Sequence, residues 1–291
     1  MTRPDPIFDL FALDRRQARA VRVLVLTGYG LNCEAETVAA FERLGAQAEP
    51  RHVADILEGG PEVLRPYQIL AFIGGFSFGD HIASGRVFAN RLRFRLGERL
   101  ARYIDDGGLA IGICNGFQAL VKLGVLPALG RVRGDGLARQ SASLVSNERL
   151  GYRDAWVRLA FDRESPCVFT RDLGDRILEL PSRHGEGKLV FADETVRKAV
   201  QEAHLIPARY VDELGQPTES WPANPNGSLG GAAGLCDPSG RIFGLMPHPE
   251  AYLDPENHPC WRAQAAADEL PAVGLGLHIL AGGVRAVLAG R

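Results

Sequence analysis

The sequence has few cysteines, no long apolar run and almost no net charge. Its 33 Lys and Arg against 35 Asp and Glu leave a formal charge of −2, so no strong field would attract nucleic acid or an anionic membrane. Five cysteines in 291 residues are not typical of a disulfide framework and predict reduced thiols in a cytoplasmic protein. No apolar stretch reaches the ~20 residues that span a bilayer. Residues 1–20 lack the apolar segment of a secretory signal.

Hydrophobic residues make up 46% of the chain, enough for a sizeable core. In the first half, short apolar runs alternate with helical periodicity, which predicts a parallel sheet covered by helices on both faces. After about residue 140, turn signals separate shorter strands. We therefore predict an N-terminal extension, residues 1–20, and one continuous α/β domain, residues 21–291, with additional strands in its second half. The expected strands are residues 21–27, 68–73, 109–113, 155–161, 176–180, 205–211, 231–235 and 242–245. The expected helices are residues 34–44, 88–104, 117–123, 195–202 and 275–288.

Cys114 stands where a predicted strand runs directly into a predicted helix, with Gly112 and Gly116 on either side. A small residue on each side of a nucleophile is the layout of a sharp strand-to-helix turn that exposes the side chain. The helix N-terminus would stabilise a thiolate, and the backbone N–H of Asn115 could hold an oxyanion. A buried structural cysteine explains the same pattern about equally well. The other cysteines do not stand at such a turn, so we interpret them as core or surface thiols. They are Cys33, Cys167, Cys236 and Cys260.

Two other segments that follow predicted strands offer matching chemistry. His248 and Glu250 could act as a base and the carboxylate that orients it, although a surface turn is by itself the simpler interpretation. The backbone N–H groups of residues 74–76, Gly-Gly-Phe, could form the other half of an oxyanion hole. A tight turn would use the same two glycines.

Taken in order, these segments resemble the class I (triad) glutamine amidotransferases. Within that class, the resemblance is closest to the glutaminase subunit of phosphoribosylformylglycinamidine synthase, the PurQ type. It covers roughly residues 21–280, and the ordered set of motifs is more specific than any one of them. The motifs are residues 30–33 (Gly-Leu-Asn-Cys), 74–80 (Gly-Gly-Phe-Ser-Phe-Gly-Asp), 112–118 (Gly-Ile-Cys-Asn-Gly-Phe-Gln), 184–187 (His-Gly-Glu-Gly), 224–228 (Asn-Pro-Asn-Gly-Ser) and 246–250 (Met-Pro-His-Pro-Glu).

The resemblance implies a three-layer, open and mostly parallel sheet of the flavodoxin-like type, and hydrolysis of L-glutamine through a cysteinyl thioester. The ammonia would pass to a large synthetase subunit that converts formylglycinamide ribonucleotide to its amidine in purine biosynthesis, with a small accessory subunit as a further partner. The implied roles are Cys114 as nucleophile, His248 as base, Glu250 as orienting acid, Gly75 and Asn115 as oxyanion donors, and Gln118, His184 and Gly185 as lining of the glutamine pocket.

A nucleotide-triphosphate site is not expected on this chain. Gly187-Lys188 is followed by Leu189 rather than Ser or Thr, and Ser182 stands where a Walker glycine would be. We expect no cofactor or metal on this chain, and ATP and Mg²⁺ on the partner synthetase.

The sequence departs from the family pattern in three places. Residues 1–20 precede the usual start and either pack on a partner or are disordered. Gly151-Tyr152 stands where the family commonly has Arg-Phe, and residues 251–273 form a long link before the last helix.

Rival interpretations remain open. His184, Glu186, His248 and Glu250 could be metal ligands of a hydrolase, but their spacing matches no common zinc pattern and leaves Cys114 without a role. Residues 28–30, Gly-Tyr-Gly, suggest a dinucleotide-binding module that lacks its third glycine. An inactive homologue is a third alternative, but it would not need the intact Cys, His and Glu. Related amidotransferases use the same triad with other ammonia acceptors, so a different acceptor is also open.

Overall fold

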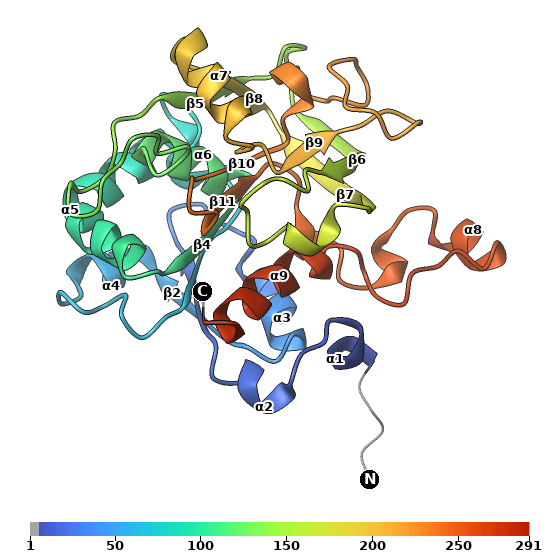
Figure 1. The fold of residues 1–291 in the computed structure, drawn as a ribbon, viewed down its shortest axis with the longest axis horizontal. Coiled ribbons are helices and arrows are strands. Elements are labelled where there is room, and N and C mark those ends of the chain that lie inside the picture. Colours follow the sequence, from blue (N-terminus) through green and yellow to red (C-terminus); the bar gives the residue numbers. More distant parts are fainter. Residues whose placement is uncertain (1–5, 291) are drawn as a thin grey trace.

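A six-stranded sheet forms the centre of the computed structural model, which describes residues 6–290 (Figure 1). Its strand order is β10-β11-β4-β3-β1-β2. All neighbours pair in parallel except β10, which is antiparallel to β11. The strands are β1 Arg22–Thr27, β2 Gln47–His52, β3 Ile69–Phe72, β4 Leu109–Ile113, β10 Gly234–Cys236 and β11 Ile242–Leu245.

Helices cover both faces of the sheet and make the three layers that the resemblance implies. Helices α3 (Glu34–Arg43) and α9 (Leu277–Leu288) pack on one face, and α5 (Arg86–Asp105) and α6 (Asn115–Leu123) pack on the other (Figure 1). This is why β3 and β4 are buried along their whole length and consist of apolar residues and glycine. Within residues 6–290, none of the helices combines the length and apolar character that a membrane crossing requires.

The strand order creates a switch point between β1 and β3. From β1 the chain first adds β2 on one side, and then returns to place β3 on the other side. Ligands of open α/β sheets bind in the crevice at the carboxyl ends of such strands. Here the two loops are joined by hydrogen bonds from Asn32 N to the Gly74 carbonyl (3.1 Å) and from Phe76 N to the Gly30 carbonyl (2.8 Å).

Most of the additional strands of the second half do not extend the central sheet. Strands β6 (Arg153–Phe161), β7 (Ile177–His184) and β9 (Ala208–Tyr210) form one small antiparallel sheet, and β5 (Ala142–Ser146) pairs with β8 (Glu186–Phe191) in another. The sequence prediction missed β2, β5, β8 and the short helices α4 (Val53–Glu58) and α8 (Trp261–Ala266). Strand β2 lies at an edge of the sheet and carries polar residues and a proline, so it lacks the apolar run by which buried strands are recognised. The helix predicted over residues 195–202 is α7 (Glu194–Glu202).

Residues 6–20 are folded and pack on this chain itself, so disorder is wrong for this part of the extension, and packing on a partner stays a prediction. Helices α1 (Pro6–Leu10) and α2 (Arg15–Ala18) lie beside α3 and α9 (Figure 1). The Phe11 side chain is 2% exposed and its ring centroid lies 4.9 Å from that of His278. Arg285 of α9 also donates a hydrogen bond to the Phe11 carbonyl at 3.3 Å. The first five residues of the predicted extension lie outside the described part of the chain.

Candidate active site

Cys114 occupies a sharp turn between β4 and α6, as its flanking glycines predict. Its φ of 51° and ψ of −106° are a backbone conformation that residues with a Cβ rarely adopt. A Cβ on Gly116 would lie 1.8 Å from the Phe72 carbonyl oxygen, and one on Gly112 would lie 2.9 Å from Gly116. Both neighbours must therefore be glycine for the helix to start this close to β3 and β4.

The side chains of His248 and Glu250 form a buried pair beside this turn. His248 Nδ1 lies 2.7 Å from Glu250 Oε1, and the two residues are 5% and 1% exposed. Because a carboxylate accepts hydrogen bonds, Nδ1 carries the proton and Nε2 is left to exchange one. This Nε2 has no hydrogen-bond partner among the described residues. The Cys114 thiol instead donates to the Arg183 carbonyl at 3.5 Å.

The charge on His248 is governed by two opposing effects. Burial disfavours the imidazolium, but the negative charges of Glu250 and then of Cys114 favour it more, so the pKa of His248 lies well above its ordinary value. A protonated imidazole beside a sulfur atom is the arrangement that stabilises a thiolate nucleophile.

A cavity of about 230 Å³ connects these groups, and its size suits a ligand no larger than an amino acid. It brings together four of the predicted site residues, Gly75, Cys114, His248 and Glu250. Two larger hollows of about 610 Å³ lie near the opposite, amino ends of β4 and β11 and contain none of the predicted site residues. The remaining lining residues of the smaller cavity are Asn32, Cys33, Glu36, Phe76, Tyr152, Arg183 and Ala251.

Asn115 and Gln118 lie behind the cavity and hold its walls together. The Asn115 amide donates to Gln118 Oε1 (2.9 Å) and to Asp80 Oδ1 (3.0 Å), and its oxygen accepts from the Ser77 N–H (3.2 Å). Gln118 donates to the Glu186 carbonyl at 2.6 Å. Asn115 is the first residue of α6, so its backbone N–H has no acceptor within the helix. Its predicted role as an oxyanion donor therefore stays a prediction. The predicted contact of Gln118 with glutamine stays a prediction.

His184 and Gly185 are also absent from the cavity lining, whereas their neighbour Arg183 is part of it. His184 is buried, with Nδ1 3.0 Å from Asn147 Oδ1. Burial, together with the charge of His248, lowers the pKa of His184 to about 4, so it is neutral near pH 7. Their predicted place in the glutamine pocket is therefore also left as a prediction.

The four residues of the alternative metal site do not converge in the described structure. Glu186 accepts a hydrogen bond from the Ser84 N–H at 3.2 Å, and His184 faces Asn147. His248 and Glu250 do lie close to a third side chain of a type that binds metals, but this third side chain is neither His184 nor Glu186.

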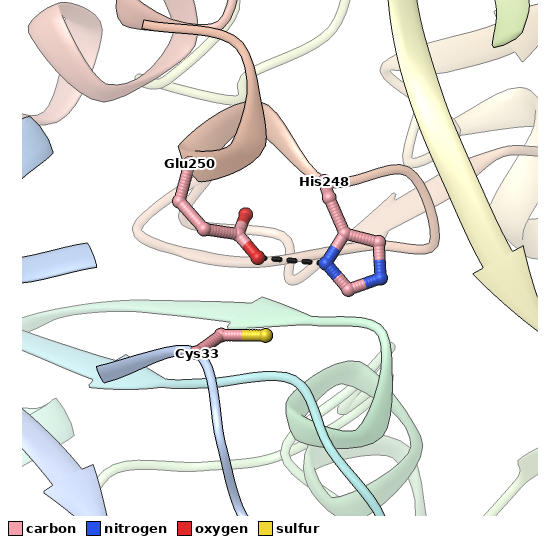
Figure 2. A group of neighbouring side chains, drawn as sticks. All are labelled: Cys33, His248 and Glu250. Carbon is pink, nitrogen blue, oxygen red and sulfur yellow. Dashed lines mark hydrogen bonds and ion pairs between the residues drawn. The ribbon is translucent and has the colours of Figure 1, made fainter. Parts of the chain in front are cut away.

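Cys33 is this third side chain, and the structure places it in the cavity, which its interpretation as a core or surface thiol did not anticipate. Figure 2 shows its sulfur pointing toward the His248–Glu250 pair. One ligand atom from each of the three residues lies within 4.8 Å of the others. Burial raises the pKa of the Cys33 thiol, opposed by a weaker effect of its contact with His248. The signal that could have located it is its position just after β1, at the switch point of the sheet.

The fold and the site together define a class of protein. A cysteine at a strand-to-helix turn, beside a buried His–Glu pair at the carboxyl edge of an open α/β sheet, is suited to attack on an amide or ester. Residues 20–279 match the CobB/CobQ-like glutamine amidotransferase domain. The class is therefore that of the glutamine amidotransferases.

Sequence and structural relatives narrow this class. A phosphoribosylformylglycinamidine synthase subunit PurQ from Dehalococcoides mccartyi is 43% identical over 265 residues, covering 91% of this chain and 97% of the relative. One from Methanococcus maripaludis is 40% identical and covers 80% and 82%. A chain in the structure of PurLQS from Thermotoga maritima matches with a TM-score of 0.67 and 25% identity, covering 92% of this chain and 99% of that one. The chain belongs to the PurQ family of glutamine amidotransferases, which confirms the predicted family and fold class.

Proposed function

We propose that this chain hydrolyses L-glutamine to glutamate and ammonia, and passes the ammonia to a synthetase that converts formylglycinamide ribonucleotide to its amidine in de novo purine biosynthesis. The observation that carries the proposal is the shared cavity, in which the Cys114 thiol faces the buried His248–Glu250 pair. The names of the relatives support the choice of acceptor, because the Dehalococcoides and Methanococcus proteins are subunits of phosphoribosylformylglycinamidine synthase.

In the proposed reaction, the Cys114 sulfur attacks the carboxamide carbon of glutamine and His248 holds the thiol proton. The tetrahedral intermediate then collapses, the C–N bond breaks, and His248 returns that proton to the leaving nitrogen, so that ammonia departs. A water molecule attacks the resulting γ-glutamyl thioester, with His248 as base, and releases glutamate and the free thiol. Glu250 keeps the imidazole oriented and stabilises its charged form.

The oxyanion of each tetrahedral intermediate would be held by two backbone N–H groups, those of Gly75 and Asn115. Gly75 lines the cavity, and its φ of 135° places its backbone where a residue with a Cβ would be strained. The N-terminus of α6 adds a favourable field at the same point. Gln118, His184 and Gly185 would contact the bound glutamine if substrate binding draws their segments toward the cavity.

The rest of the reaction is assigned to other chains. We place ATP and Mg²⁺ on the large synthetase subunit, add a small accessory subunit to the complex, and assign the whole to the cytoplasm. Within this chain, residues 21–291 would be the amidotransferase domain and residues 1–20 an extension of it.

A Cys114→Ala variant tests the proposal in the reconstituted complex. Glutamine-dependent amidine formation should be abolished, because no other group supplies the nucleophile, whereas added ammonium should still support synthesis. Cys260→Ala is the matched control, since Cys260 is exposed and lies outside the cavity. Full glutamine-dependent turnover by Cys114→Ala would refute the assignment.

A further inference from the structure

The thiol of Cys33 is a potential metal ligand that the proposed reaction does not use. It lines the same cavity as Cys114 but follows β1, and Figure 2 shows its sulfur beside the His248–Glu250 pair. Its sulfur, one imidazole nitrogen and one carboxylate oxygen lie within 4.8 Å of one another. A thiolate, an imidazole and a carboxylate are the donor types that bind zinc.

The spacing of these three atoms suits a tetrahedral ion. Zinc bonds of about 2.0–2.3 Å place neighbouring ligand atoms roughly 3.3–3.8 Å apart. His248 Nδ1 and Glu250 Oε1 are 2.7 Å apart, and the ligand atoms of all three residues lie within 4.8 Å of one another, so an ion would have to move the imidazole and the carboxylate slightly apart without a change of fold. All three residues line the cavity, so a water molecule from it could take the fourth position.

Two further features leave the group free to take a ligand. Glu250 Oε2 is buried and has no hydrogen-bond partner among residues 6–290, so the carboxylate has unused acceptor capacity. Glu36, which is exposed, also lines the cavity and adds a negative charge for an approaching cation.

We propose that Cys33, His248 and Glu250 form an inhibitory binding site for a zinc-class divalent cation. The inhibition rests on the proposed function, whereas the binding does not. The ion replaces the proton on the Cys33 sulfur and the proton on His248 Nδ1. With the metal on Nδ1, the single proton of the neutral ring is carried by Nε2, so no ring nitrogen is free to accept the proton of Cys114. Zinc therefore blocks the glutaminase reaction without occupying the nucleophile.

Zinc binding to the full-length chain tests the site directly. Zn²⁺ titrated against a chromophoric chelator should show one ion per wild-type chain, and Cys33→Ala should weaken the affinity by about tenfold or more. Cys33→Ser serves if the alanine variant does not fold. Cys114→Ala and the control Cys260→Ala should keep the wild-type affinity. Equal affinity in wild type and both Cys33 variants, or loss of zinc in Cys114→Ala alone, would overturn the proposal.

Activity of the complex gives the second measurement. Zn²⁺ should inhibit glutamine-dependent synthesis at concentrations that leave ammonium-dependent synthesis unchanged, and the Cys33 variants should need about tenfold more zinc for the same fractional inhibition. Equal sensitivity of Cys33 variants and wild type would contradict the assignment. Absence of glutamine hydrolysis in metal-free wild-type complex would refute the proposed function instead, and would leave the binding result standing.

Discussion

His248 is held in place by contacts on several sides. Its backbone N–H donates to the Pro181 carbonyl at 2.8 Å, its Nδ1 contacts Glu250, and Gly74 leaves room for the ring. Catalytic groups must be positioned to within a fraction of an ångström, and a displacement of about 1 Å can reduce the rate by roughly 10²-fold. The glycine beside the ring therefore helps to set the position of the imidazole.

Substitution of Gly74 by alanine should displace the imidazole while the fold survives. The added Cβ would lie 2.8 Å from His248 Cε1 and 3.1 Å from Cys33 Sγ. We expect kcat/KM for glutamine to fall by about 10²-fold, with ammonium-dependent synthesis and Tm near those of wild type. Gly60→Ala is the control, since nothing lies within 4 Å of its added Cβ. Unchanged glutamine kinetics in Gly74→Ala would show that the ring tolerates the shift.

Glu250→Gln should be less damaging than His248→Ala. The glutamine amide oxygen can still accept a hydrogen bond from His248 Nδ1, so orientation is partly kept, whereas alanine at 248 removes the base itself. We expect a loss of about 10²–10⁴-fold in kcat for His248→Ala and a smaller loss for Glu250→Gln, measured as glutamate release by the complex. If both variants lose activity equally, Glu250 does more than orient the ring.

At the scale of single elements, α9 is the helix that joins the N-terminal segment to the sheet. Its His278 packs edge-on against Phe11, and its Arg285 reaches the Phe11 carbonyl. Burial and the charges of Arg176 and Arg285 lower the pKa of His278 to about 4. The imidazole is thus neutral in the folded protein at pH values where it would be charged in the unfolded chain.

This difference makes stability fall on acidification. Between about pH 6.5 and pH 4 the unfolded chain binds more protons at His278 than the folded chain does, so the free energy of unfolding decreases as pH falls through this range. From pH 7 to pH 5 the contribution of this residue is about 2 kcal/mol. Between pH 7 and pH 5, the free energy of unfolding of His278→Gln should therefore fall by about 2 kcal/mol less than that of wild type. Urea unfolding of both proteins at the two pH values measures this difference.

The control for this experiment is His204→Gln. Hydrogen bonding to Asp162 raises the pKa of His204, so this residue contributes with the opposite sign and its removal should not reduce the acid sensitivity. An equal loss of stability in wild type and His278→Gln would show that His278 is not responsible.

For the whole molecule, the loops after β1, β3, β4 and β11 meet at one edge of the sheet, and the Cys114 thiol there also contacts a strand of the small antiparallel sheet. The Cys114 thiol donates to the Arg183 carbonyl, and His248 Nε2 has no partner in the described chain. A contact that closes only in the complex would keep ammonia from being released without an acceptor.

We therefore expect the isolated chain to hydrolyse glutamine slowly. Addition of the synthetase should raise kcat/KM for glutamate release by about tenfold or more, because docking would move the segment around Arg183 and release the Cys114 thiol from the Arg183 carbonyl. Titration of the synthetase against a fixed amount of this chain provides the measurement. The same rate with and without the partner would mean that the free chain is already active.

The sequence predicted the buried strands and the order of the site motifs. Strands of a buried parallel sheet are short apolar runs, and here they are followed directly by glycine or by a predicted site residue. It failed at β2, whose edge position needs no apolar run, and at residues 6–20, whose partner is α9 at the other end of the chain. Strands β5 and β8 were missed for a related reason: both belong to a small, partly exposed sheet with a mixed pattern.

By itself, the sequence determined the family and the sharp turn at Cys114, and it predicted His248 as the base, since each depends on residue types at fixed local spacing. Only the tertiary structure decided that Gln118 braces the wall of the site, that Arg183 rather than His184 lines the cavity, and that Cys33 faces His248. These contacts join residues far apart along the chain. They depend on which strands become neighbours, which no local pattern specifies.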